Sequence, residues 1–179
     1  MREKNGFFGI VLVILVLVLT YFIYLGGLNE ISFNEKYYDN FTFVYTNVSG
    51  NYLLKNNLNL GDSFLNKSLI ETDKYIWKFD SRDKFFGSGE YLKGVELDRV
   101  MIAKINDLEN YSVENFRGKD YLVSEFPYKN KLSFLVSDYK VYSNLDKELS
   151  RRNYNLTSST VIYDNVENKL IYLFDVNTS

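Results

Sequence analysis

The hydrophobic pattern begins with an apolar run from Phe7 to Leu25, FFGIVLVILVLVLTYFIYL, which only Gly9 and Thr20 interrupt. As a helix rising about 1.5 Å per residue, the run measures roughly 28 Å, which matches the hydrocarbon thickness of a bilayer. A buried core helix would show a polar face, and this run has none. A cleaved signal peptide has a shorter apolar region and small residues at its cleavage site, whereas this run is long and ends in bulky residues. We therefore predict an uncleaved, single-pass transmembrane signal anchor within residues 1–28.

The charges on either side of this run predict its orientation. Arg2 and Lys4 precede the apolar run, whereas Glu30, Glu35 and Lys36 follow it. Positive residues beside a membrane helix favour the cytoplasmic side. The sequence therefore predicts a cytoplasmic N-terminus and an extracytoplasmic domain.

Beyond the anchor, residues 29–40 are predicted as a linker and residues 41–179 as one folded domain. Alternation of apolar and polar residues is typical of half-buried strands, and clusters of Gly and Asn separate such strands. The first half also contains a candidate helix at 58–71, loop-like residues at 80–94 and a polar connection at 106–120. The predicted strands are 41–45, 74–79, 98–105, 121–126, 160–163 and 170–176.

The second half carries the clearest helical pattern. Apolar residues recur there at three- and four-residue steps, which predicts one face of an amphipathic helix. These residues are Leu132, Leu135, Tyr139, Tyr142, Leu145 and Leu149. A hairpin across 164–169 follows. Each half thus reads strand, helix, strand, strand, so we predict an α+β fold of two βαββ units sharing an antiparallel sheet, with the helices on one face and a concave face left open.

Composition narrows the chemistry. The chain has no Cys and no His, which excludes disulfides, thiolate nucleophiles, zinc ribbons and Ser–His–Asp triads. The formal net charge is −2 and no basic stripe stands out, which argues against a nucleic-acid partner. We expect no cofactor, no metal site and no catalytic residue that the sequence alone can assign.

The stretch from Asp120 to Val176 resembles the GyrI-like family of effector-binding domains. The resemblance rests on DYLVSEFPYKNKLSF, VYSNLDKELSRRNYNLTSSTVIYDN and KLIYLFDV. In the first half, residues 44–54 with Gly50 and Tyr52 match the family only in outline. The resemblance implies two βαββ units with a cleft between them that binds small, often aromatic or cationic molecules. Some relatives hydrolyse small electrophiles, and others bind proteins.

One departure from the family bears on ligand charge. Family members that bind cationic drugs often carry a buried Glu in the strand that reads TVIYDN here, and this chain has Val161 at that position. A buried carboxylate attracts a cation, so its loss favours a neutral ligand. Alternatively, Glu90, Glu96 or Glu125 substitutes for it. The missing Glu also weakens the hydrolase interpretation.

Aromatic side chains in or near the strands are the candidate ligand-binding residues, with two acids beside them. Each could equally be an ordinary core aromatic or a solvated surface acid, since strands favour aromatics and Glu is seldom buried. Trp77, the sole tryptophan, is the strongest candidate. The full set is Tyr45, Tyr52, Trp77, Phe79, Glu90, Tyr91, Glu125, Phe126, Tyr128 and Tyr163.

The sequence therefore predicts a membrane-tethered small-molecule-binding domain with an aromatic cleft. A protein-interaction module at the membrane surface is an alternative, and a flat exposed aromatic patch would favour it. A small hydrolase is another, and a carboxyl group of raised pKa beside a Tyr in the cleft would favour that.

Overall fold

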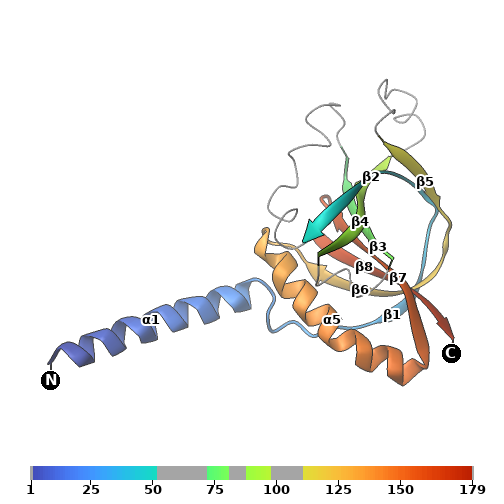
Figure 1. Cartoon of the computed structure of the whole chain (residues 1–179). Coiled ribbons are helices and arrows are strands. Elements are labelled where there is room, and N and C mark those ends of the chain that lie inside the picture. The colour runs from blue at the N-terminus through green and yellow to red at the C-terminus, as the bar shows by residue number, and fades with distance from the viewer. Residues whose placement is uncertain (1, 52–71, 81–87, 98–110, 179) are drawn as a thin grey trace.

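The computed structural model describes residues 2–51, 72–80, 88–97 and 111–178. Two helices, α1 (Arg2–Tyr24) and α5 (Leu132–Arg152), accompany an eight-stranded sheet (Figure 1). The strands are β1 (Asn34–Tyr38), β2 (Phe41–Asn51), β3 (Lys74–Phe79), β4 (Ser88–Leu97), β5 (Ser112–Phe116), β6 (Lys119–Pro127), β7 (Tyr154–Asp164) and β8 (Lys169–Thr178).

The strands form one sheet in the order β1-β6-β8-β7-β3-β4-β2-β5, and every neighbouring pair is antiparallel. Strand β3 pairs with β7, with Trp77 opposite Val161, and this pairing joins the two halves of the chain. The sheet curls strongly, and α5 lies outside the curl (Figure 1). The predicted α+β class with a shared antiparallel sheet is therefore confirmed.

The outer face of the sheet packs against α5. Alternate residues of the central strands point to this side and are buried in one large cluster. The indole of Trp77 meets the ring of Phe134 edge-on, with centroids 5.3 Å apart. The cluster includes Trp77, Phe79, Leu122, Phe126, Phe134, Val141, Tyr142, Leu145, Val161, Tyr172 and Phe174.

The other alternate residues of the same strands point into the curl of the sheet, and we call this side the inner face. It carries its own buried cluster, which includes Phe41, Phe43, Ile76, Phe116, Tyr121, Val123, Ile162, Ile171 and Leu173. Gly94 of β4 lies under this cluster. A Cβ there would come within 1.9 Å of the Val44 carbonyl oxygen and 2.8 Å of the Phe43 ring. Only glycine therefore lets the Phe43 ring lie across β4.

One carboxyl group is buried beneath α5. Asp138 is almost fully buried, and its Oδ1 accepts a short hydrogen bond from the hydroxyl of Tyr172. The same hydroxyl lies 2.6 Å from Oγ of Ser137. Asp138 Oδ2 has no hydrogen-bond partner in the described part of the chain. Burial raises the pKa of Asp138 well above its usual value, although the bond from Tyr172 opposes this shift.

Several predicted elements are confirmed. The structure has the strand at 74–79, the helix beginning at Leu132, and the hairpin, in which β7 and β8 pair around Asn168 at a φ of 51°. The predicted helix at 58–71 and strand at 98–105 lie outside the described residues.

Three segments differ from the prediction. The predicted linker 29–40 contains β1, the loop-like segment 80–94 contains the start of β4, and the polar connection 106–120 contains β5. Strands β1 and β5 lie at the two edges of the sheet, so only one of their sides is paired and their polar sequences are tolerated. Strand β4 lies between β3 and β2, and backbone pairing holds its glycines extended.

Helix α1 projects away from the sheet (Figure 1). Its side chains are described from Phe8 onward. In the part of the chain that the structure describes, no helix is long and apolar enough to cross a membrane, so the predicted transmembrane segment is not supported. The end of α1 is fastened to the domain: Leu25 is buried, and Lys140 Nζ donates a hydrogen bond to the Gly27 carbonyl at 2.8 Å.

Candidate functional site

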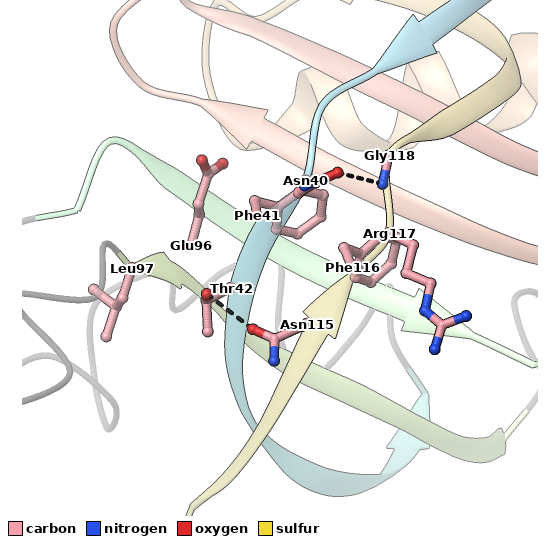
Figure 2. A pocket seen from close by; sticks show the side chains of 9 residues that line it. All are labelled: Asn40, Phe41, Thr42, Glu96, Leu97, Asn115, Phe116, Arg117 and Gly118. Atoms are coloured by element: carbon pink, nitrogen blue, oxygen red, sulfur yellow. Dashed lines mark hydrogen bonds between the residues drawn. The ribbon is translucent and has the colours of Figure 1, made fainter.

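A cavity of about 660 Å³ opens at the edge of the sheet, where β2 begins and where β4 and β5 end (Figure 2). Three neighbouring strands supply its walls, and the turn after β5 closes one side. The lining residues are Asn40, Phe41, Thr42, Glu96, Leu97, Asn115, Phe116, Arg117 and Gly118.

Two stacked aromatic rings form the apolar part of this cavity. Phe41 and Phe116 lie opposite each other in the β2–β5 pairing, and their ring centroids are 4.4 Å apart at an interplanar angle of 16°. Both residues are largely buried. Because they belong to paired strands rather than to free loops, the rings present a preformed apolar surface.

Polar groups surround the rings. Thr42 Oγ1 donates to Asn115 Oδ1 at 3.2 Å, and the Gly118 N–H donates to Asn40 Oδ1 at 2.8 Å. Both Asn amide nitrogens and the guanidinium of Arg117 have no hydrogen bond or ion pair with any residue that the structure describes. The cavity thus combines aromatic surface with spare hydrogen-bond donors. It can hold a planar molecule that carries acceptor groups.

The one acid lining the cavity is already paired. Glu96 Oε2 lies 2.9 Å from Lys74 Nζ, and this pair raises the pKa of Lys74 although burial opposes the shift. A second hollow, of about 290 Å³, continues along the inner face between Phe116 and Tyr121. Its acids, Glu114 and Asp175, are also paired with lysines.

Most of the sequence-predicted aromatic residues lie elsewhere. They belong to the buried cluster on the outer face, beneath α5 and the neighbouring strands, and none of them lines the cavity. These are Trp77, Phe79, Tyr91, Phe126, Tyr128 and Tyr163. Tyr45 instead packs on the inner face, where its ring stacks on Phe43 at 5.0 Å. Tyr52 lies outside the described residues.

The predicted acids lie apart from one another. Glu90 is exposed on β4. Glu125 is exposed on β6, 3.3 Å from Lys36 and 3.2 Å from Lys169; burial would raise its pKa, but the two lysines together lower it. Glu96 is the alternative acid that reaches the cavity.

The position of the missing family Glu is also clear. Val161 belongs to the cluster beneath α5, whereas its neighbour Ile162 belongs to the inner face. Both residues are fully buried and apolar. This strand therefore gives neither face a carboxylate at that point.

The structure also locates the carboxyl group of raised pKa that a hydrolase would need beside a Tyr. It is Asp138 next to Tyr172, and both are enclosed between α5 and β8. Neither residue lines the cavity of about 660 Å³ or the second hollow of about 290 Å³. This pair cannot reach a substrate in the present arrangement, so it gives the hydrolase alternative no support.

The cavity residues were missed because β5 was interpreted as a connection. Its sequence, SVENF, has only two apolar residues, and its outer side is unpaired. The sequence signal that could have revealed the cavity is a pair of Phe residues, Phe41 at the start of β2 and Phe116 at the end of β5. Each of them directly follows an Asn. Their proximity depends on a strand pairing across more than sixty residues of chain.

No protein-family model and no curated protein sequence matches this chain. Among solved structures, the C-terminal domain of EcmrR is similar with a TM-score of 0.58 at 10% identity, covering 83% of this chain and 99% of that domain. SAV2435 bound to tetraphenylphosphonium gives 0.51 at 11% identity, covering 82% and 94%. EcmrR in its DNA complex gives 0.53 at 12% identity, covering 93% of this chain and 65% of that one. These likenesses support the fold that the GyrI-like resemblance implies.

Proposed function

We propose that this chain is an effector-binding domain and that its small-molecule ligand occupies the 660 Å³ cavity between β2, β4 and β5. The cavity itself carries the proposal, because its size falls within the roughly 300–1,000 Å³ of typical ligand sites. The shared fold adds support, since SAV2435 is bound to tetraphenylphosphonium. The ligand is aromatic and either neutral or anionic. The stacked rings of Phe41 and Phe116 cover its flat face, and Arg117 and Asn115 donate to its acceptors.

A thermal-shift screen of the full chain in detergent tests this proposal. Matched sets of neutral, anionic and cationic aromatic compounds would be compared. A ligand at a hundred times its dissociation constant stabilises the folded state by about 2.7 kcal/mol, which shifts the melting temperature measurably. We expect stabilising compounds among the neutral and anionic sets.

Two tryptophan substitutions on β5 supply the site test. Asn115→Trp fills the cavity and should abolish the shift, whereas Val113→Trp places the same ring at an exposed position outside the cavity and should leave it unchanged. A shift that survives Asn115→Trp would place the ligand elsewhere. A folded chain that no compound stabilises would instead favour a protein-interaction module.

We further propose that α1 holds the domain at a membrane, with the N-terminus in the cytoplasm and the domain outside. The support is the side chains of α1 from Phe8 to Tyr24, which are predominantly apolar and exposed to solvent. An apolar surface of this extent marks a membrane or protein contact, and an apolar run that contains no charged residue favours lipid.

Alkaline carbonate extraction of membranes from expressing cells tests this attachment. The full chain should stay in the membrane pellet, and Leu12→Arg with Leu15→Arg should release it, because each Arg at the helix centre costs about 2.5–3.5 kcal/mol on insertion. Tyr37→Arg with Val113→Arg adds the same charges to exposed domain positions and should leave the chain in the pellet. Release of the unaltered chain would contradict the proposal.

Labelling of a single cysteine tests on which side of the membrane the domain lies. Since the chain has no Cys, a Tyr139→Cys variant carries one exposed thiol, which an impermeant maleimide labels only if the domain is outside.

A further inference from the structure

The ammonium group of Lys78, on the inner face, lies in surroundings that favour a cation. Lys78 Nζ lies 5.1 Å from the ring centroid of Phe116 and 2.7 Å from Glu114 Oε1. Lys78 comes from β3, and Glu114 and Phe116 come from β5, with β4 and β2 between these strands in the sheet. The three side chains point to the same side, as the shared hollow shows. The ammonium group is thus held by an aromatic face and a carboxylate together.

The same arrangement recurs twice on this face. In each case a lysine ammonium lies within 6 Å of an aromatic ring and is paired with a carboxylate. Lys74 lies 5.8 Å from the Tyr38 ring and 2.9 Å from Glu96, and Lys119 lies 5.1 Å from the Tyr121 ring and 2.5 Å from Asp175. Three repeats on one face, with lysines on β3 and β6 and carboxylates on β4, β5 and β8, argue against a chance surface pairing.

An aromatic face beside a carboxylate is the environment that binds organic cations, because the negative face of the ring and the acid both attract positive charge. Each of these environments is filled by an ammonium of the chain itself. A tethered group competes at a high effective concentration, so a free cation must displace it to bind.

We propose that these lysines act as built-in cations that exclude cationic ligands from the inner face, and that removing one exposes a binding site for an organic ammonium ion. The site so exposed beside Glu114 and Phe116 takes quaternary ammonium compounds of small size, as the volume of about 290 Å³ permits. This inference rests on the proposed ligand-binding function in one respect: it explains why the ligand of that function is neutral or anionic.

Lys78 is the decisive residue. Its side chain is 19% exposed, against 28% for Lys74 and 44% for Lys119, so its ammonium is the most enclosed of the three. Replacement by Met keeps the length and the apolar stem while removing the charge. Glu114 then loses its cation, and the Phe116 ring is uncovered.

The experiment measures binding of benzyltrimethylammonium to the full chain in detergent by isothermal titration calorimetry. We expect Lys78→Met to bind this compound at least roughly tenfold more tightly than any binding detected for the unaltered chain, since ring and carboxylate both become available. Adding Glu114→Gln to Lys78→Met should remove most of the gain, and Lys78→Arg, which keeps a cation, should show none.

A matched control separates this site from a general change of charge. Lys36→Met also removes an ammonium paired with an acid, but no aromatic ring of the described residues lies under Lys36. It should therefore gain no binding. Equal binding to the unaltered chain and to Lys78→Met, or equal gain with Lys36→Met, would overturn the proposal.

A Lys78 variant that does not fold gives no test of the role of Lys78, so far-UV circular dichroism checks that each variant is folded. In that case Lys119→Met gives the same test at the more exposed ring of Tyr121. Absence of any gain in folded Lys119→Met would then overturn the proposal. The neutral and anionic compounds that test the proposed function are measured separately, so failure of one does not imply failure of the other.

Discussion

Replacing Trp77 by Ala is expected to lower the free energy of unfolding by about 3–5 kcal/mol, which is the usual cost of removing a buried Trp or Phe side chain. Trp77 is fully buried, packs edge-on against Phe134 at the start of α5, and lies opposite Val161 in the pairing that joins the two halves. Its loss would leave a cavity where helix and sheet meet. Since domains are stable by only about 5–15 kcal/mol, the variant should lose a large share of its stability.

Chemical denaturation of the full chain in detergent, followed by far-UV circular dichroism, measures this effect. Fluorescence cannot serve, because Trp77 is the single tryptophan. Trp77→Phe keeps most of the ring and should cost less, and Tyr139→Ala, at a position 69% exposed on α5, should change stability by no more than about 0.5 kcal/mol. If Trp77→Ala stayed as stable as the parent chain but lost ligand binding, the cleft role first predicted for Trp77 would be restored.

Stability is expected to fall as pH rises, because of Asp138. Its pKa is raised in the folded state by burial, so between the ordinary carboxyl pKa and the raised one the folded chain binds more protons than the unfolded chain. The stabilisation is fully present below the ordinary pKa and is lost as pH rises through the raised one. The slope in that window approaches about 1.4 kcal/mol per pH unit for a single group.

Urea denaturation at a series of pH values between about 5 and 8 measures this slope. The chain has no His and no Cys, so few other groups titrate there. Asp138→Asn should flatten the profile and raise stability at the upper end, whereas Asp146→Asn, an exposed change on the same helix, should preserve the profile. A flat profile for the unaltered chain would mean that folding does not raise the pKa of Asp138.

The sequence predicted the extent of helix α5 well, but it predicted only some of the residues that the helix buries. Tyr142, Leu145 and Leu149 are buried as expected, yet Leu132, Leu135 and Tyr139 are exposed. Polar residues take their places on the buried side, among them Ser133, Ser137 and Asp138. Ser133 and Ser137 bond to the backbone, and Asp138 accepts from Tyr172 through Oδ1 while its Oδ2 has no partner among the described residues. No hydrophobic pattern can reveal such polar contacts.

The predicted ligand-binding aromatics lie away from the cavity for a different physical reason. Alternation within a strand predicts two faces but does not say which face a helix will cover. In β3, Trp77 and Phe79 turned out to face the α5 side, while Ile76 and Lys78 face into the curl. The cavity depends further on β5 lying against β2, and that contact joins segments whose own sequences are weak strand signals.

The place of β8 has a consequence for how the chain is made. Strand β8 lies between β6 and β7 near the middle of the sheet, although its residues, 169–178, come last in the described chain. Strands β1 and β3 likewise pair with partners made much later, β6 and β7. During synthesis the edges of the early strands therefore stay unpaired until residues 169–178 have left the ribosome. Such long-range pairings form slowly, and until β8 pairs the exposed edges of the early strands favour aggregation.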